Sequence, residues 1–139
     1  MKEGGSMPVK STIDPNSGVI VRAVSGDVSF DELLRALDRI VDHPLYQPGS
    51  AALWDFSNAA ADKLDTKGLR NLVGRVRERM GSRGTGYKVA LVAPRDLDYG
   101  LARMYQAYAS ELPIALSVFR SSGEAWDWLS EDTKLPSAT

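Results

Sequence analysis

The residues from Tyr87 to Ala93 (YKVALVA) form an almost uninterrupted apolar run between Gly86 and Pro94. Such a run is typical of a strand that is covered on both faces, and strands of this kind occur mainly in parallel sheets. Parallel strands are joined by crossover connections, which are usually helices. The run therefore predicts an α/β fold in which helices pack on a central sheet.

Four segments with helical spacing of apolar residues lie between or after the predicted strands. They cover residues 30–41, 66–80, 96–110 and 122–129. The pairs that form capping boxes are Ser29 with Glu32 and Ser121 with Glu124. Val41 belongs to the apolar stripe of the first helix and Leu97 to that of the third, so both are expected to face inward. Asp96 is placed to cap the third helix, and Gly81, Gly84 and Gly86 are expected to break the second.

Five short apolar segments with strand character accompany these helices. They cover residues 9–13, 19–24, 51–54, 87–93 and 116–119. The turn residues 14–18 (DPNSG) join the first two strands as an antiparallel hairpin, whereas helical crossovers make the remaining strands parallel. Asp55 is expected to end the third strand, and a polar loop then leads to the helix that starts at Thr66.

These elements predict one α/β domain over residues 8–130, with a single mixed, mostly parallel five-stranded sheet, an antiparallel N-terminal strand and four helices. We expect residues 1–7 to be a flexible N-terminus or linker, and residues 131–139 to be a flexible C-terminal tail. The segment from Met1 to Ser6 contains no apolar stretch, so no signal peptide is expected.

The composition excludes several classes of function. The formal net charge of −1 argues against a general attraction to nucleic acid, and the absence of cysteine excludes disulfides, thiol catalysis and cysteine zinc sites. His43 is the only histidine, so no histidine metal cluster can form. No apolar run approaches the roughly 20 residues that a spanning helix requires, and we expect a cytoplasmic protein.

Three short segments carry a resemblance to a known family: Gly26–Leu33 (GDVSFDEL), Trp54–Ser57 (WDFS) and Tyr99–Tyr105 (YGLARMY). With the order of the elements, they resemble the STAS domain, the fold of bacterial anti-sigma factor antagonists. The nearest likeness is to the divergent SpoIIAA-like group, which is also grouped with Sec14-like lipid-binding proteins. The resemblance covers residues 9–129, and it implies a non-enzymatic regulatory or binding module.

The resemblance marks a candidate protein-contact region from Ser57 to Arg70. In the antagonists, a strand that ends in Asp-Leu-Ser leads to an Asp-Ser-Ser-Gly-Leu turn, where a partner kinase phosphorylates a serine. Asp55–Ser57 is similar to the first motif, and Asp65–Leu69 (DTKGL) is similar to the second, except that Lys67 replaces a serine. The candidate phosphoacceptors are Thr66 and Ser57, and the candidate partner-binding residues are Asp55, Asp65, Lys67 and Arg70. The alternative is that Asp65 or Thr66 only caps the helix.

The implied partner is a sigma-regulatory or signalling protein. A second hypothesis is the binding of a lipid or small apolar ligand, which the Sec14-like relationship implies. The third and fourth predicted helices contain more large side chains than one face can bury, so the remainder can line a ligand pocket or a homodimer contact. The candidate pocket residues are Met104, Tyr105, Tyr108 and Trp128.

A third hypothesis is an enzyme that uses a cluster of carboxylates at the carboxyl edge of the sheet, as a magnesium site would. The aspartates in question are Asp55, Asp62, Asp65, Asp96 and Asp98. We nevertheless assign no catalytic residue, metal or cofactor, because no catalytic motif surrounds them. Basic residues predominate between Lys63 and Lys88. This indicates a contact for an acidic partner protein, a phosphorylated ligand or a lipid headgroup, or else a solvated helix face.

Overall fold

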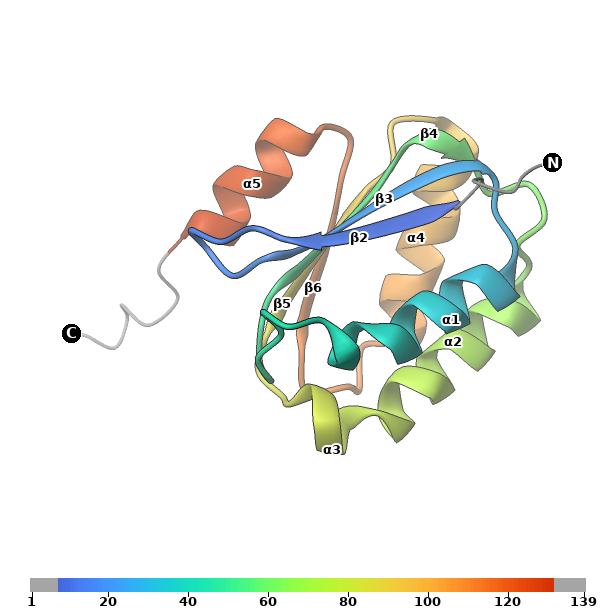
Figure 1. Ribbon diagram of the computed structural model, residues 1–139. Coiled ribbons are helices and arrows are strands. Elements are labelled where there is room, and N and C mark those ends of the chain that lie inside the picture. The colour runs from blue at the N-terminus through green and yellow to red at the C-terminus, as the bar shows by residue number, and fades with distance from the viewer. Residues whose placement is uncertain (1–7, 132–139) are drawn as a thin grey trace, which may run out of the picture.

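The computed structural model describes residues 8–131, in which one five-stranded sheet carries helices on both faces (Figure 1). The strands are β2 (Val9–Ile13), β3 (Ile20–Asp27), β4 (Ala52–Ala60), β5 (Lys88–Val92) and β6 (Ala115–Phe119). The helices are α1 (Phe30–Arg39), α2 (Thr66–Glu78), α3 (Met80–Arg83), α4 (Asp96–Tyr108) and α5 (Ser122–Ser130), with a 3-10 turn η1 at Ile40–Asp42. The two ends that were predicted to be flexible lie outside the described residues, apart from Glu131.

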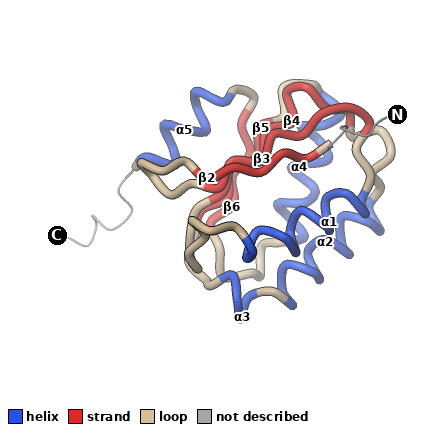
Figure 2. Tube along the Cα trace, in the orientation of Figure 1, coloured by secondary structure: helices blue, strands red, loops and turns tan. Residues whose placement is uncertain are grey.

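The order of the strands in the sheet follows the order of the chain, β2-β3-β4-β5-β6. Strand β2 is antiparallel to β3, and all other neighbours are parallel, which confirms the predicted hairpin and mixed sheet. Each crossover moves in the same direction across the sheet, so right-handed connections place α1, α2 and α4 on one face. Helix α5 follows the last strand and covers the other face (Figures 1 and 2). Within residues 8–131, no helix is both long and apolar enough to cross a bilayer.

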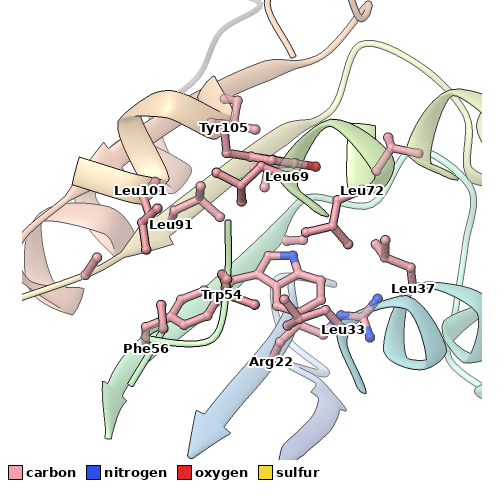
Figure 3. A pocket seen from close by; sticks show the side chains of 18 of the residues that line it. Arg22, Leu33, Leu37, Trp54, Phe56, Leu69, Leu72, Leu91, Leu101 and Tyr105 are labelled. Carbon is pink, nitrogen blue, oxygen red and sulfur yellow. The ribbon is translucent and has the colours of Figure 1, made fainter. Parts of the chain in front are cut away.

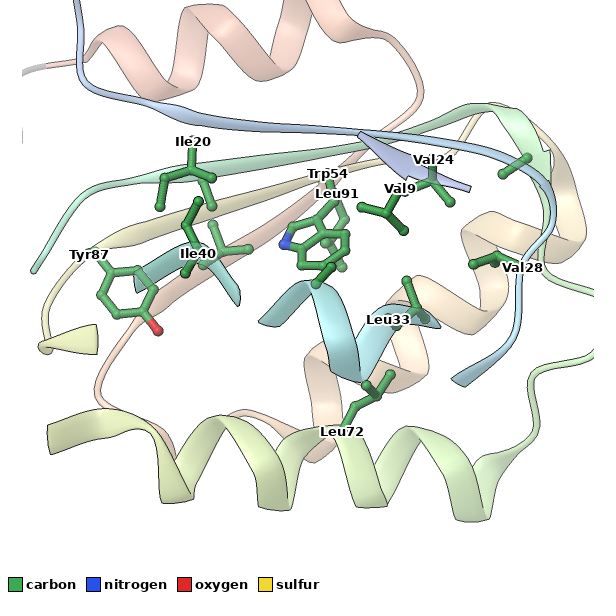
Figure 4. Packing of buried hydrophobic residues seen from close by; sticks show 14 of the residues in the cluster. Val9, Ile20, Val24, Val28, Leu33, Ile40, Trp54, Leu72, Tyr87 and Leu91 are labelled. Atoms are coloured by element: carbon green, nitrogen blue, oxygen red, sulfur yellow. The ribbon is translucent and has the colours of Figure 1, made fainter. Parts of the chain in front are cut away.

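Alternate residues of the central strands contribute to two separate cores, because successive side chains point to opposite faces of a sheet. Leu53 and Ala90 pack against Ala125 of α5. Trp54 and Leu91 pack on the opposite side, above helices α1 and α2 (Figure 4). The prediction that the run from Tyr87 to Ala93 is buried on both faces is therefore confirmed.

Two of the helix starts have the predicted cap, and α5 has one half of its predicted capping box. Ser29 and Glu32 form a reciprocal capping box, Asp65 accepts a hydrogen bond from the Gly68 N–H at 2.9 Å, and Ser121 accepts one from the Glu124 N–H. The prediction for Asp96 is wrong. Arg95 occupies the N-cap position of α4 without a side-chain cap, and Asp96 is already helical. The Oδ1 atom of Asp96 instead accepts a hydrogen bond at 2.7 Å from Arg120, which directly follows β6.

Strand β4 is longer than predicted, and Asp55 does not end it. The strand continues to Ala60 because its second half pairs with the end of β3, where Asp27 lies opposite Ala60. A register shift in the β3–β4 pairing accompanies this extension. Asp55 lies opposite Val92, the last residue of β5, so it is still level with the carboxyl end of its other neighbour.

Two residues that were predicted to face inward are exposed. Helix α1 changes into the 3-10 turn η1 at Ile40, which stays buried, and the tighter turn leaves Val41 outside with 42% exposure. Leu97 is 49% exposed because Asp98 takes the inward position in the first turn of α4. Asp98 accepts a hydrogen bond from the Ala61 N–H at 3.1 Å.

Gly81, Gly84 and Gly86 were predicted to break the second helix, but α2 already ends at Glu78. Gly81 lies inside the short helix α3, and Gly84 ends it with a φ of 91°. A Cβ atom at Gly84 would lie 2.8 Å from the backbone nitrogen of Gly49. Gly84 is therefore required both for its positive φ and for the close approach of these two loops.

The contact between α1 and α2 depends on the absence of a side chain at Gly68, whose Cβ would lie 1.8 Å from Cε2 of Phe30. We expect Gly68→Ala to lower the free energy of unfolding by about 1–3 kcal/mol through overpacking, although alanine is the better helix former. The matched control is Gly74→Ala in the same helix, because no atom lies within 4 Å of that Cβ. Urea unfolding of both variants checks this, and equal effects of the two changes would contradict it.

Asp38 of α1 joins the two helices by accepting hydrogen bonds from Arg75 at 2.7 Å and from Arg79 at 2.8 Å. The bond from Arg79, with a further contribution from Arg75, lowers the pKa of Asp38. A lowered carboxyl pKa stabilises the fold above the unfolded-state pKa of about 3.9, and this stabilisation is lost as the pH falls through the folded-state value.

We therefore expect Asp38→Asn to cost about 1 kcal/mol at pH 7, because the network is partly exposed, and to cost nothing at a pH below the folded-state pKa of Asp38. Denaturant unfolding at both pH values measures the difference. Asp42→Asn is the control, since Asp42 is exposed and forms no ion pair within residues 8–131. A loss of stability that is the same at both pH values would contradict this role of the carboxylate.

Candidate functional site

A cavity of about 110 Å³ lies between the sheet and helices α1, α2 and α4 (Figure 3). Mainly apolar side chains line the cavity, from the sheet on one side and from the three helices on the other. Prominent members of the wall are Trp54, Phe56 and Leu91 from the strands and Leu33, Leu69, Leu101 and Tyr105 from the helices. The site is therefore a largely apolar space inside the larger of the two cores.

The local sequence explains why this space stays open. Ala52, Trp54 and Phe56 alternate along β4 and line the same cavity. Four positions in the cavity wall carry alanine, and larger side chains there would fill the cavity. These residues are Ala52, Ala61, Ala93 and Ala102. An apolar cavity of about 150 Å³ in another protein stays dry and binds benzene. The volume here is of the same order, so it can accept a small ring or a short aliphatic chain.

Arg22 is the most deeply buried charged group in the cavity wall, with 2% exposure. Its Nη1 donates to the Ala36 carbonyl at 2.7 Å and to Ser11 Oγ at 3.0 Å, and its guanidinium lies 4.7 Å from the centre of the Trp54 ring. Its Nε has no hydrogen-bond partner among residues 8–131. Burial, with a smaller contribution from the charge of Arg83, lowers the pKa of Arg22 to about 10.

Arg83 lines the same cavity from the end of α3. Its guanidinium stacks on Tyr87 at 3.8 Å, and its Nη2 donates to the Ser50 carbonyl at 2.6 Å. Its Nη1 is buried and has no hydrogen-bond partner in the described chain. Neither Arg22 nor Arg83 forms an ion pair with a carboxylate of residues 8–131.

Among the described residues that line the cavity, Asp98 is the one acidic side chain, and it is 3% exposed. Its charge is partly compensated, because Oδ2 lies 3.6 Å from the Arg95 Nε and Oδ1 accepts the hydrogen bond from Ala61. Burial raises the pKa of Tyr105, so this phenol stays neutral at physiological pH. The cavity therefore combines apolar walls with two guanidinium groups that have no anionic partner in the described part of the chain.

Of the four predicted pocket residues, Tyr105 lines the cavity. Met104 and Tyr108 are half-buried on the same helix but do not line it, and Arg70 stacks on Tyr108 at 4.8 Å. Trp128 belongs to α5 on the opposite face of the sheet, where its ring packs 5.6 Å from that of Phe119. The sheet therefore separates Trp128 from the other three residues.

The predicted protein-contact residues lie in the middle of β4 and at the start of α2. Asp55 is half-buried and accepts a hydrogen bond from the Ser57 N–H at 2.9 Å, while Asp65 accepts the capping bond from Gly68. The first of these hydrogen bonds lies within β4, and the second caps α2, so each carboxylate is engaged with its own local backbone. The exposed members of the set are Ser57, Asp65, Thr66, Lys67 and Arg70.

Two of the five aspartates of the enzyme hypothesis, Asp62 and Asp98, form ion pairs with the same arginine, Arg95, and the other three do not. Asp62 accepts a hydrogen bond from Arg95 at 3.0 Å, Asp96 accepts one from Arg120, and Asp98 is buried in the cavity wall. In the part of the chain that the structure describes, no three histidine or carboxylate side chains are grouped to hold a metal ion. The structure therefore gives no support to a carboxylate cluster formed by these residues.

Sequence reasoning missed Arg22 and Arg83 as residues of the site. The signal for Arg22 was present in the strand VIVRAV, where it alternates with Ile20 and Val24 and must therefore share their inward face. Arg83 gave no such signal, because it lies among glycines and other basic residues and reads as a solvated side chain. Its inward position results from the packing of α3 against the loop at Ser50.

No family model matches the sequence, and no curated protein matches it. Comparison with solved structures finds an uncharacterized protein of the DUF3478 family from Shewanella loihica PV-4, which is described as having a SpoIIAA-like fold. The identity is 14%, the match covers 87% of this chain and 91% of that chain, and the TM-score is 0.51. At this identity the similarity establishes the fold alone, and it confirms the predicted SpoIIAA-like fold.

Proposed function

We propose that this SpoIIAA-like domain is a binding module that holds a small apolar ligand in the cavity between α4 and the sheet. The observation that carries the proposal is a space of about 110 Å³ with apolar walls in the middle of the main core. Apolar pockets with a few polar groups are the usual form of small-molecule sites. A ligand here would contact the sheet through Trp54 and Leu91 and the helices through Leu101 and Tyr105.

The energetics of packing support this proposal. An unfilled apolar cavity costs about 24 cal/mol per Å³, so a space of about 110 Å³ costs on the order of 2–3 kcal/mol. Such a cost is a large fraction of the stability of a small domain. A larger side chain at Ala102 would remove much of the space. A ligand that enters the cavity recovers the missing contacts and stabilises the folded state in proportion to its concentration.

Two-dimensional NMR with benzyl alcohol and benzoate as probes tests the proposal. We expect at least one probe to shift the indole N–H resonance of Trp54, which lines the cavity, and to leave that of Trp128 unchanged. Native mass spectrometry of the freshly purified protein is expected to show a small bound molecule. If neither probe shifts Trp54 and no molecule is bound, the proposal is wrong.

Protein contact at the exposed start of α2 stays a second, separate prediction. Thr66 and Lys67 are exposed in the first turn, where backbone N–H groups and the helix dipole favour a phosphate on Thr66. The cavity is favoured over this surface because it has an identified volume and unpaired donors. Mapping of amide shifts with a candidate partner tests the surface, and shifts confined to another face would count against it.

A further inference from the structure

Two arginines lie together at one end of the cavity. Arg22 and Arg83 line the main cavity and also a smaller adjoining one of about 30 Å³, and both cavities share Tyr87. Each guanidinium has a buried N–H nitrogen without an acceptor, Nε on Arg22 and Nη1 on Arg83. A guanidinium can donate five hydrogen bonds, and a buried donor without a partner is unfavourable. The hydrogen bonding of the pair is therefore incomplete within residues 8–131.

No ion pair among the described residues compensates the positive charge of Arg22 and Arg83 at this end of the site. Arg79 also lines the smaller cavity, but it is paired with Asp38. Asp38 also forms an ion pair with Arg75, and the buried Asp98 forms one with Arg95. No carboxylate of residues 8–131 forms an ion pair with either Arg22 or Arg83. The like charge of Arg83 disfavours the charged form of Arg22 further, and a bound anion would relieve both effects.

A carboxylate suits these donors. Its two oxygens accept parallel hydrogen bonds from guanidinium groups, and one negative charge is less costly to desolvate among apolar side chains than the two of a phosphate. A volume of about 30 Å³ has room for one or two waters, which is about the size of a carboxylate group. The remaining space of about 110 Å³ is apolar and suits a small ring or chain.

We propose that the ligand is a small carboxylic acid, whose ionised carboxylate binds between Arg22 and Arg83 and whose apolar body fills the cavity beneath Trp54. This inference rests on the proposed function and specifies the class of ligand. The neighbouring positions of Arg22 and Trp54 are visible in Figure 3. The orientation places the charged group at the α3 end and the apolar group toward Leu101 of α4.

Titration calorimetry with matched probes tests the inference. Benzoate is expected to bind about tenfold or more tightly than benzyl alcohol, which has the same ring without the charge, because charge-assisted bonds are worth more than neutral ones. Benzamidine, which is cationic, is expected not to bind. Inorganic phosphate, which has charge but no apolar body, is expected not to compete with benzoate.

Two arginine variants and a matched control separate charge from packing. Arg22→Met and Arg83→Met are each expected to weaken benzoate binding about tenfold or more while they leave benzyl alcohol binding within about threefold. Arg103→Met, on the exposed face of α4, is expected to change neither. Because Arg22 is buried, circular dichroism is used to check that Arg22→Met folds. If Arg22→Met does not fold, Arg83→Met provides an independent test, because Arg83 is only half-buried.

The outcomes distinguish this inference from the proposed function. If benzyl alcohol binds as tightly as benzoate, or if the arginine variants leave benzoate binding unchanged, the acid inference is wrong and the apolar site stands. If neither probe binds the wild-type protein, both are overturned. Competition by phosphate would also overturn the inference, because it would identify a simple anion site.

Discussion

Replacement of Trp54 by alanine is expected to lower the free energy of unfolding by about 3–5 kcal/mol, which is the range for large aromatic residues in cores. Trp54 is 9% exposed at the centre of the sheet, and its ring stacks with that of Phe56 at 6.5 Å. It also covers the buried guanidinium of Arg22 at 4.7 Å, and such a contact contributes up to about 2 kcal/mol when it is desolvated.

The cost should lie toward the upper part of this range. The side chains next to Trp54 already line an open space, so they cannot easily close around the additional void. Urea unfolding followed by circular dichroism measures the change without depending on tryptophan fluorescence. Trp128→Ala is the matched control, since Trp128 is half-buried on the other face and away from the cavity, and its loss is expected to be smaller.

Added indole is expected to restore part of the lost stability of Trp54→Ala and none of that of Trp128→Ala. An apolar molecule binds a dry cavity that matches its shape, and binding to the folded state raises the melting temperature. Equal losses in the two variants, or a loss at Trp54 below about 1 kcal/mol, would contradict the view that Trp54 organises this core.

The substitution Ala102→Leu is expected to stabilise the protein by about 1–2 kcal/mol and to abolish binding of benzoate and benzyl alcohol. Leucine adds three carbons, each worth about 0.8 kcal/mol when buried, and a part of this gain is offset by imperfect fit. Ala102 lines the cavity from α4, so the larger side chain would occupy the space that the ligand needs. A gain in stability with a loss of function is typical of functional sites.

Ala107→Leu provides the control for this experiment. Ala107 is exposed on the same helix, so the same substitution is expected to change stability by less than about 0.5 kcal/mol and to leave binding intact. Thermal unfolding and calorimetry measure the two effects. If Ala102→Leu destabilises the fold and still binds the probes, the cavity is already filled and the proposed function fails.

Much of the fold could be predicted from the sequence, because local patterns determine it. The hairpin between Val9 and Val24, the buried run from Tyr87 to Ala93 and the caps at Ser29 and Asp65 all depend on neighbouring residues. The errors arose where tertiary contacts decide. Pairing with β3 extends β4 beyond Asp55, and the Asp98–Ala61 hydrogen bond turns Asp98 inward.

The candidate site was less accessible to sequence reasoning. Tyr105 was predicted as a pocket residue because it belongs to an aromatic helix, but the same reasoning selected Trp128, which the topology places on the opposite face. The direction of each crossover decides which helices share a face, and α5 has no crossover to fix it. The inward turn of Arg83 depends on a contact with Ser50, which is distant in the sequence.

The most direct measurement of the central claim is a crystal structure of the protein under xenon pressure. Xenon enters apolar cavities and gives strong density without any polar contact. The cavity predicts a xenon peak enclosed by Trp54, Leu91 and Tyr105. Side chains that close this space, with no xenon between them, would contradict the presence of the cavity and with it the proposed binding function.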